Sequence, residues 1–403
     1  MPPKTLIQLT LAIAAILLAG PVKASEPAPS PAPAASATAD SAIEQHMAEA
    51  GIVGLGAAII VDKKVVWAKG FGFADKARGV PFTPDTVMNI GSISKTVTGV
   101  ALMQAVQEGK LALDEDINVY LPFKVANPHH PNDKITLRQL ATHTSSINDR
   151  WAVYSGTYYF GGTPEPLGDF LKAYFVAQGK HYAAENFLKA RPGTQREYSN
   201  IAAGLAGYIV ERVTGENLKA YTKRRIFAPL QMNNSGWSLA DAGPARQSQL
   251  YASQDGWPLP ILNYEMTTYP DGGVRTSVAD LSKFFAALLD GGVHEGARIL
   301  DQRMADEMLR FQFTDANKPA NVNPQKLNSG LFWATKHGAT RIGHNGSDPG
   351  VRTEMLANLG KDIGVIMFAN TSLPEQDDRR YAAIHQELWK RAEMMKKAGQ
   401  AAR

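Results

Sequence analysis

Residues 91–99 read G-S-I-S-K-T-V-T-G and place a hydroxyl at Ser92 three positions before an amine at Lys95. Small and apolar residues follow with helical spacing, so the pattern predicts a helix that begins near Ser92. Residues i and i+3 of a helix lie on one face, about 5–6 Å apart at Cβ. The lysine is therefore expected beside the serine.

A serine hydroxyl next to a lysine amine is the smallest arrangement that can make serine a nucleophile. The hydroxyl needs an adjacent base at neutral pH. A lysine can act as that base only where burial or a neighbouring charge lowers its pKa. The four-residue pattern S-x-x-K also arises by chance, so its catalytic interpretation depends on the features that follow it in the chain.

Residues 1–24 have the layout of a signal peptide. Lys4 stands before an apolar run over residues 11–18, and residues 22–24, V-K-A, have the small-x-small form of a cleavage site. The run is shorter than the roughly 20 residues that span a bilayer, so a retained anchor is the weaker alternative. The sequence predicts cleavage after Ala24 and a secreted, periplasmic protein without a stable membrane anchor.

The composition changes again after this segment. Residues 25–38 are rich in Ser, Pro and Ala and predict a flexible linker. Residues 39–396 have an ordinary globular composition and are numerous enough for one large domain. Residues 397–403 are expected to form a C-terminal tail.

Composition and charge exclude several classes of function. The chain has 403 residues, a formal net charge of +4 and no cysteine, so it forms no disulfide. The brief basic run at residues 223–225 follows a helical pattern and is interpreted as a solvated helix end, so no nucleic-acid partner is expected. The sequence contains no His-Glu-x-x-His motif or Cys cluster, and neither a metal nor another cofactor is predicted.

Strand-like patterns lie at both ends of the chain, and helical patterns lie between them. Residues 53–61 and 65–73 predict a hairpin, and an amphipathic helix is predicted over residues 378–395. We therefore predict an α+β fold: one antiparallel sheet built from N- and C-terminal strands and flanked by helices, with an inserted, mostly helical lobe. The predicted C-terminal strands cover residues 330–335, 340–344, 351–359 and 362–370.

The second feature is Tyr198-Ser199-Asn200, which stands before a helical run of small residues at 202–213. A tyrosine and an asparagine two positions apart in an extended turn can point the same way and present a phenol and an amide to one site. A phenol beside a lysine can relay protons. The alternative interpretation is a turn whose asparagine caps the following helix.

The third feature is His344-Asn345-Gly346 on a predicted strand. Its glycine would let a substrate approach the strand edge, and the next backbone N–H, that of Ser347, could face an oxyanion. A single histidine on a strand is otherwise a structural or surface residue, so this triplet gains weight only in combination with the other two.

In this order and at these spacings, the three features resemble the S-x-x-K, Y-x-N and K/H-x-G boxes of the penicillin-recognising serine hydrolases. The resemblance is specifically to the class C β-lactamase type, which includes DD-carboxypeptidases, D-aminopeptidases and related esterases. It covers residues 52–370 and implies a β-lactamase/transpeptidase-like fold. Further segments that match are residues 69–72 (K-G-F-G), 140–145 (L-A-T-H-T-S) and 272–277 (G-G-V-R-T-S).

The resemblance implies a role for each box residue. Ser92 is the expected acylated nucleophile, and Lys95 and Tyr198 are expected to share the role of general base. Asn200 would orient the site. His344 would contribute to proton transfer or substrate binding.

By the same resemblance, the oxyanion hole consists of the backbone N–H groups of Ser92 and Ser347. Asn345 and Gly346 complete the third box and are expected to contact the substrate. A small molecule or a peptide is the expected substrate, and the oligomeric state is left open.

An aromatic loop lies between the first two boxes, at residues 151–162. It supplies Trp151 and Tyr158 as candidate substrate contacts and could be a pocket wall or a lid, or equally a hydrophobic cluster that covers the helical lobe. His143 suggests a charge-relay histidine. In the resembled family its T-H-T-S segment is a structural turn, and we prefer that role.

The chain departs from class C β-lactamases in two boxes. The second is Y-S-N in place of Y-A-N, and the third is H-N-G in place of K-T-G. A mostly neutral histidine is a poorer partner for a β-lactam carboxylate than a lysine is. We therefore predict a serine hydrolase that forms an acyl-enzyme at Ser92 with an ester or an amide/peptide substrate. The alternatives are a β-lactamase or DD-carboxypeptidase, a penicillin-binding sensor that acylates without efficient turnover, and a protein with a vestigial site.

Overall fold

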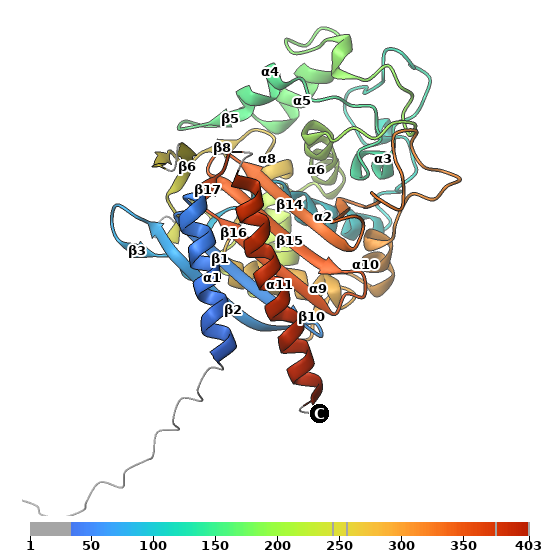
Figure 1. The fold of residues 1–403 in the computed structure, drawn as a ribbon. Coiled ribbons are helices and arrows are strands. Elements are labelled where there is room, and N and C mark those ends of the chain that lie inside the picture. Colours follow the sequence, from blue (N-terminus) through green and yellow to red (C-terminus); the bar gives the residue numbers. More distant parts are fainter. Residues whose placement is uncertain (1–33, 244–245, 255–256, 375–376, 402–403) are drawn as a thin grey trace, which may run out of the picture.

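The computed structural model of the chain describes residues 34–243, 246–254, 257–374 and 377–401 (Figure 1). The predicted signal peptide and most of the predicted linker lie outside these residues. Helix α1 (Ala34–Ala50) begins inside the segment expected as a linker, and helix α11 (Asp378–Ala401) continues through most of the segment expected as a tail. Within the described ranges, no helix combines the length and the apolar character needed to cross a bilayer.

The centre of the molecule is an antiparallel sheet of eight strands in the order β12-β13-β14-β15-β16-β1-β2-β3. Strand β1 pairs with β16, so segments from the two ends of the chain meet inside the sheet, as predicted. The strands are β1 (Gly54–Val61), β2 (Lys64–Asp75), β3 (Val80–Pro81), β12 (Ser329–Gly330), β13 (Trp333–Lys336), β14 (Arg341–Asp348), β15 (Val351–Asn358) and β16 (Ile363–Ala369).

Helices cover both faces of the sheet, and each face has a hydrophobic core. In β16, Val365 and Met367 pack with α1 and α11, whereas Ile366 and Phe368 pack on the side of α2 (Ser94–Gln107) and α9 (Val278–Leu289). This alternation is the ordinary geometry of a strand that is buried on both faces. In Figure 1 the blue α1 and the red α11 lie side by side across the sheet.

The middle of the chain forms the predicted helical lobe. Its main helix, α6 (Asn200–Thr214), starts at the Ser199 hydroxyl, which accepts a hydrogen bond from the Ala202 N–H, and ends at Gly215 with a φ of 69°. Helix α6 packs against α2, which carries the first box. The other helices are α3 (Leu137–Ala141), α4 (Trp151–Tyr154), α5 (Leu167–Phe175), α7 (Leu218–Thr222), α8 (Tyr269–Gly272) and α10 (Gln302–Leu309).

Short strand pairs fix the segments that surround the first box. Strand β4 (Met88–Asn89) pairs with β9 (Arg275–Thr276) just before Ser92. Strand β5 (Tyr158–Tyr159) pairs with β8 (Glu265–Met266) and so anchors the aromatic loop. The remaining strands are β6 (Leu250–Gln254), β7 (Trp257–Ile261), β10 (Val293–His294), β11 (Ala297–Arg298) and β17 (Thr371–Ser372).

Candidate active site

Ser92 lies in a 3₁₀ turn, Gly91–Ile93, that leads directly into α2. Gly91 has a φ of 53°, which glycine adopts without strain, and a Cβ at this position would lie 3.2 Å from the Ser347 nitrogen. The turn therefore brings Ser92 next to the backbone of β14. The α-helix begins two residues after Ser92, yet the predicted neighbour is in place, because Lys95 Nζ lies 3.0 Å from Ser92 Oγ.

Lys95 is fully buried, and each of its three N–H groups has an acceptor. Besides Ser92, Nζ donates to Asn200 Oδ1 at 2.7 Å and to the Asp271 carbonyl oxygen at 2.8 Å. Burial lowers the pKa of Lys95, but its interactions with Tyr198, Asp271 and Asp348 outweigh burial and raise this pKa above its ordinary value. Lys95 is therefore a cation in the resting site, whereas a lysine base requires a lowered pKa.

Tyr198 and Asn200 are held at the start of α6 by a carboxylate that the sequence analysis missed. Asp149 accepts hydrogen bonds from the Ser199 hydroxyl and from the Asn200 backbone N–H, both at 2.6 Å. The Asn200 side chain is directed to Lys95, whose ammonium lies 5.0 Å from the centre of the Tyr198 ring. Ser199 caps the helix, so the interpretation of Asn200 as the capping residue is wrong.

His143 supports the same turn. Its Nδ1 accepts a hydrogen bond from the Ser199 backbone N–H at 3.2 Å, and its ring centre lies 4.3 Å from that of Tyr198. Burial, and after it the charges of Arg196 and Lys95, lower the pKa of His143 well below its usual value, so the ring is neutral. This geometry favours the structural role over a charge-relay role.

His344 reaches the site from strand β14. It is buried, its ring centre lies 6.3 Å from that of Tyr198, and its Nδ1 shares a hydrogen bond of 2.7 Å with the Asn345 carbonyl oxygen. Burial, and after it the charges of Lys95 and Lys336, lower the pKa of His344 to about 3. The ring is therefore neutral, with the proton on Nδ1 and with Nε2 as an acceptor.

The other residues of the third box divide between the two faces of β14. Gly346 packs against Ile90, and a Cβ on Gly346 would lie 2.2 Å from the Ile90 carbonyl oxygen. Because Gly346 has no side chain, the turn that carries Ser92 can approach β14 closely. Gly346 does not line the pocket. Asn345 pairs with Glu354 of β15, so its side chain lies on the same face of the sheet as Glu354, the face that α11 covers. Asn345 therefore lines the pocket with its main chain. Ser347 lines the pocket.

A pocket of about 570 Å³ lies beside Ser92. The aromatic loop forms one of its walls, and both predicted contacts, Trp151 and Tyr158, line it together with Tyr154 and Phe160. Trp151 is 70% exposed, which places it at the rim. Such a wall offers apolar area to a substrate, while polar groups elsewhere fix the orientation.

Two carboxyl groups that the sequence analysis missed line the pocket beside this wall. Tyr154 donates a hydrogen bond to Asp271 Oδ1 at 2.9 Å, and Tyr158 donates one to Asp348 Oδ1 at 2.5 Å. Burial raises the pKa of Asp271 to about 7 and that of Asp348 to about 6. Asp271 Oδ2 is buried away from solvent.

Two cations line the pocket near His344, and the sequence analysis missed these as well. They are Arg196 and Lys336, and Arg196 Nε is buried without a hydrogen-bond partner in the part of the chain that the structure describes. Three of these four charged residues could have been found from the sequence. Asp348 and Arg196 each stand within two residues of a predicted site residue, and Asp271 directly precedes the segment 272–277 that matched the family. Lys336 lies on a separate strand and gave no such signal.

The family assignment follows from comparison with known proteins. The family model described as Beta-lactamase matches residues 39–388. "Putative penicillin-binding protein PbpX" of Bacillus subtilis (strain 168) is 29% identical over 267 residues, which cover 62% of this chain and 59% of that protein. Protein flp of Staphylococcus aureus (strain MRSA252) is 25% identical over 334 residues, which cover 82% of this chain and 62% of that protein. The chain thus matches less than two thirds of the length of these curated relatives.

Solved structures share the fold. The octameric penicillin-binding protein homologue from Pyrococcus abyssi superposes with a TM-score of 0.67 at 26% identity, over 86% of this chain and 76% of that one. D-alanine carboxypeptidase AmpC from Burkholderia cenocepacia gives a TM-score of 0.65 at 24% identity, over 88% and 99% of the two chains. At this identity the second likeness bears on the fold alone.

Proposed function

The chain belongs to the β-lactamase family of penicillin-recognising serine hydrolases, and from this premise we propose that it cleaves an ester or amide bond through an acyl-enzyme at Ser92. The observation that carries the proposal is the 3.0 Å contact between Ser92 Oγ and the buried Lys95 ammonium at the edge of the pocket. Burying a cation destabilises a protein unless partners compensate, and perturbed groups that gather in a pocket are typical of functional sites.

We assign the base to Tyr198 and an electrostatic role to Lys95. Because Lys95 is already a cation, it cannot take the Ser92 proton, and it instead stabilises negative charge on the Ser92 and Tyr198 oxygens. Tyr198, as a phenolate, takes the proton while Ser92 attacks the carbonyl carbon, and it then passes this proton to the leaving group. In the second half, Tyr198 takes a proton from the attacking water and returns it to Ser92 as the acyl bond breaks.

The oxyanion would be bound by the backbone N–H groups of Ser92 and Ser347. The close approach of the nucleophile turn to β14 supports this assignment, since Gly91 and Gly346 lack the side chains that would separate the two segments. In serine hydrolases, one such donor stabilises the transition state by roughly 2.7–4 kcal/mol.

The charges in the pocket indicate a class of substrate. Asp271 and Asp348 lie beside the aromatic wall and suit an ammonium group, while Arg196 and Lys336 lie near His344 and suit a carboxylate. We infer a substrate that carries both groups, such as a short peptide with free ends. Arg196 and Lys336 would then supply the positive charge that the H-N-G box lacks.

The test compares three peptides of matched size: one with both ends free, its N-acetyl form and its C-terminal amide. A hydrogen bond to a charged group contributes about 1.5–3 kcal/mol, so blocking either end should lower kcat/KM by roughly 10- to 150-fold. Asp348→Asn should reduce the effect of N-acetylation and leave the effect of C-terminal amidation unchanged. Equal kcat/KM for the three peptides would contradict the substrate class, whereas trapping of an acyl adduct by mass spectrometry tests the acyl-enzyme separately.

A second candidate is a penicillin-binding protein that acylates without efficient turnover, and the name of the Bacillus subtilis relative favours it. Rapid-quench kinetics separates the two candidates. One equivalent of acyl group per chain without a following steady state would support the second candidate, and sustained release of product would support the first.

A further inference from the structure

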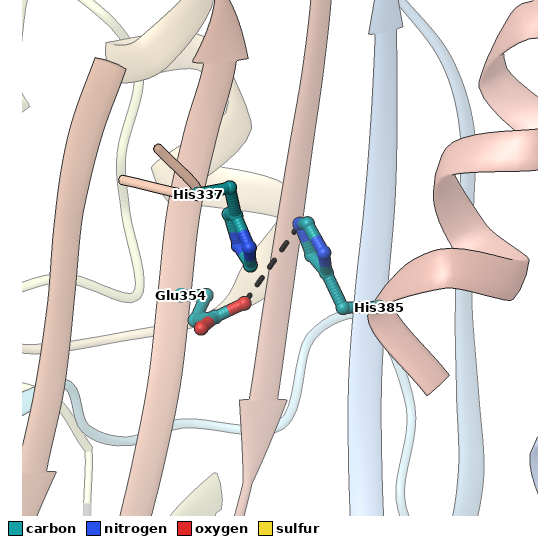
Figure 2. Close-up of side chains that lie close together, drawn as sticks. All are labelled: His337, Glu354 and His385. Carbon is teal, nitrogen blue, oxygen red and sulfur yellow. Dashed lines mark ion pairs between the residues drawn. The ribbon is translucent and has the colours of Figure 1, made fainter. Parts of the chain in front are cut away.

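A second cluster of reactive side chains lies under α11, on the face of the sheet opposite α2. Glu354 belongs to β15 and pairs with Met367, which packs in the core formed with α1 and α11. His385 belongs to α11, and His337 lies in the turn between β13 and β14. Figure 2 shows the Glu354 carboxylate beside the two imidazole rings. One possible ligand atom of each residue lies within 4.8 Å of the other two.

The polar atoms of this cluster lack the partners that buried atoms need. His385 is only 5% exposed, and neither its Nε2 nor Glu354 Oε2 has a hydrogen-bond partner within the described ranges. These two atoms face each other at 3.8 Å, which is too long for a direct hydrogen bond. Buried polar atoms in native proteins are almost always satisfied. The gap between the two atoms therefore suits an ion that bonds to both.

We propose that His337, Glu354 and His385 bind a divalent transition metal ion, with Zn²⁺ as the best match. Two imidazole nitrogens and one carboxylate are an established zinc ligand set, with bond lengths of about 2.0–2.2 Å. Tetrahedral geometry at these lengths places ligand atoms roughly 3.3–3.6 Å apart, so the Glu354–His385 pair, at 3.8 Å, must close by about 0.2–0.5 Å. The third ligand, His337, is exposed on a turn, and its ring stacks on that of His385 with the ring centres 5.1 Å apart, so it must turn to direct a nitrogen at the ion.

The protonation states of the two histidines suit a metal. Burial lowers the pKa of His385 to about 4 and lowers that of His337 below its usual value, so both rings are neutral and can coordinate.

Neighbouring charges limit this affinity. The positive charges of Arg352 and Lys336 lie close enough to Glu354 to lower its pKa, and that of Arg341 lowers the pKa of both histidines. Arg352 is partly neutralised by Asp378, 3.0 Å away. Because these cations repel a metal ion, we expect weaker binding than that of a closed structural zinc site.

The test titrates the purified, chelator-treated chain with Zn²⁺ by calorimetry. We expect one ion per chain and a loss of affinity of at least about tenfold in Glu354→Gln and in His385→Ala. His130→Ala is the matched control, because His130 also lies 3.9 Å from a carboxylate, that of Asp133, but has no third ligand nearby in the described chain. This control should bind Zn²⁺ like the wild type.

Thermal unfolding with and without Zn²⁺ distinguishes a lost ligand from a lost fold. Glu354→Gln keeps the size of the side chain, so it should remain folded but lose the increase in Tm that Zn²⁺ gives to the wild type. Bound Co²⁺ should show the visible absorption of a tetrahedral site in the wild type only. Equal Zn²⁺ affinity in the wild type and Glu354→Gln, or no binding by the wild type at millimolar Zn²⁺, would overturn the proposal and leave a stacked pair of neutral imidazoles.

Discussion

Ser92 carries the covalent step that we propose, and its replacement gives the most direct prediction. Ser92→Ala should lower kcat by at least about 10³-fold and abolish labelling by a phosphonate or a fluorescent penicillin, because the other two acceptors of Lys95 are amide and carbonyl oxygens that cannot replace the nucleophile. Intact-mass spectrometry measures the adduct. Ser253→Ala, on β6, should remain fully active as the control. An adduct on Ser92→Ala would refute the assignment.

His344 is predicted to act as a neutral hydrogen-bonding group. With a pKa of about 3 it does not titrate at the pH of ordinary assays. His344→Gln should therefore lower kcat/KM by about tenfold or less, and it should leave the shape of the pH profile unchanged. A general acid or base would contribute roughly 10²–10⁴-fold. If an inflection near the ordinary histidine pKa of about 6.5 disappears in the variant, His344 titrates and our assignment is wrong.

At the scale of elements, the start of α6 positions two of the proposed catalytic groups through Asp149. This carboxylate accepts hydrogen bonds from the Ser199 hydroxyl and from the backbone N–H groups of Asn200 and Ile201. Asp149→Asn replaces one accepting oxygen with a donor and should lower the free energy of unfolding by about 1–3 kcal/mol. It should also lower kcat by roughly 10²-fold, because it shifts groups that must be placed to within about 1 Å.

Steady-state kinetics and chemical unfolding measure both effects. Asp133→Asn is the control, since Asp133 forms an ion pair with Arg191 at the surface, where such pairs contribute little. If Asp149→Asn loses stability but keeps the wild-type kcat, then Asp149 serves folding alone.

The elements that could be predicted are those whose signal is local. The hairpin β1–β2, strands β14 to β16 and helix α11 lie close to the predicted ranges, because alternation and helical periodicity are visible within single segments. The predicted strand over residues 330–335 divides into β12 and β13, because Phe332 has a φ of 58° and turns the chain there. A positive φ at a phenylalanine has no sequence signature.

The candidate site was partly predictable for the same reason. Ser92 and Lys95 share one turn, so spacing alone placed them together. Asp271 meets Lys95 from 176 positions away in the sequence, and only tertiary packing brings such groups together. The raised pKa of Lys95 depends on Tyr198 and on the Asp271 carboxylate, 3.9 Å from the ammonium, so the sequence argument for a lysine base could not anticipate it.

At the scale of the whole molecule, the buried Glu354 should make stability depend on pH. Its pKa rises from 4.5 to about 7 on folding, so its contribution to stability is fully present below about pH 4.5 and is lost as the pH rises through 7. In the metal-free chain, Glu354→Gln should therefore gain up to about 3 kcal/mol relative to the wild type as the pH rises through this window. Chemical unfolding at several pH values measures the difference, and parallel curves would contradict the prediction.

The cluster under α11 also shows which kind of site cannot be recognised from a single sequence. Its three residues come from a turn, a strand and a helix, and they meet only because α11 packs across the sheet. The search for metal-binding motifs could exclude only sites whose ligands are close in sequence. A site assembled from separate layers of the fold leaves no such spacing.

The terminal helices α1 and α11 lie on the face of the sheet opposite α2, and in Figure 1 the start of α1 and the end of α11 are at the same end of the molecule. A tag placed at the start of α1 or at the end of α11 would therefore attach the protein to a bead or an electrode by the same end of the molecule. A peptide that joins these two helix ends would yield a cyclic chain, and new termini could then be opened in a surface loop remote from Ser92.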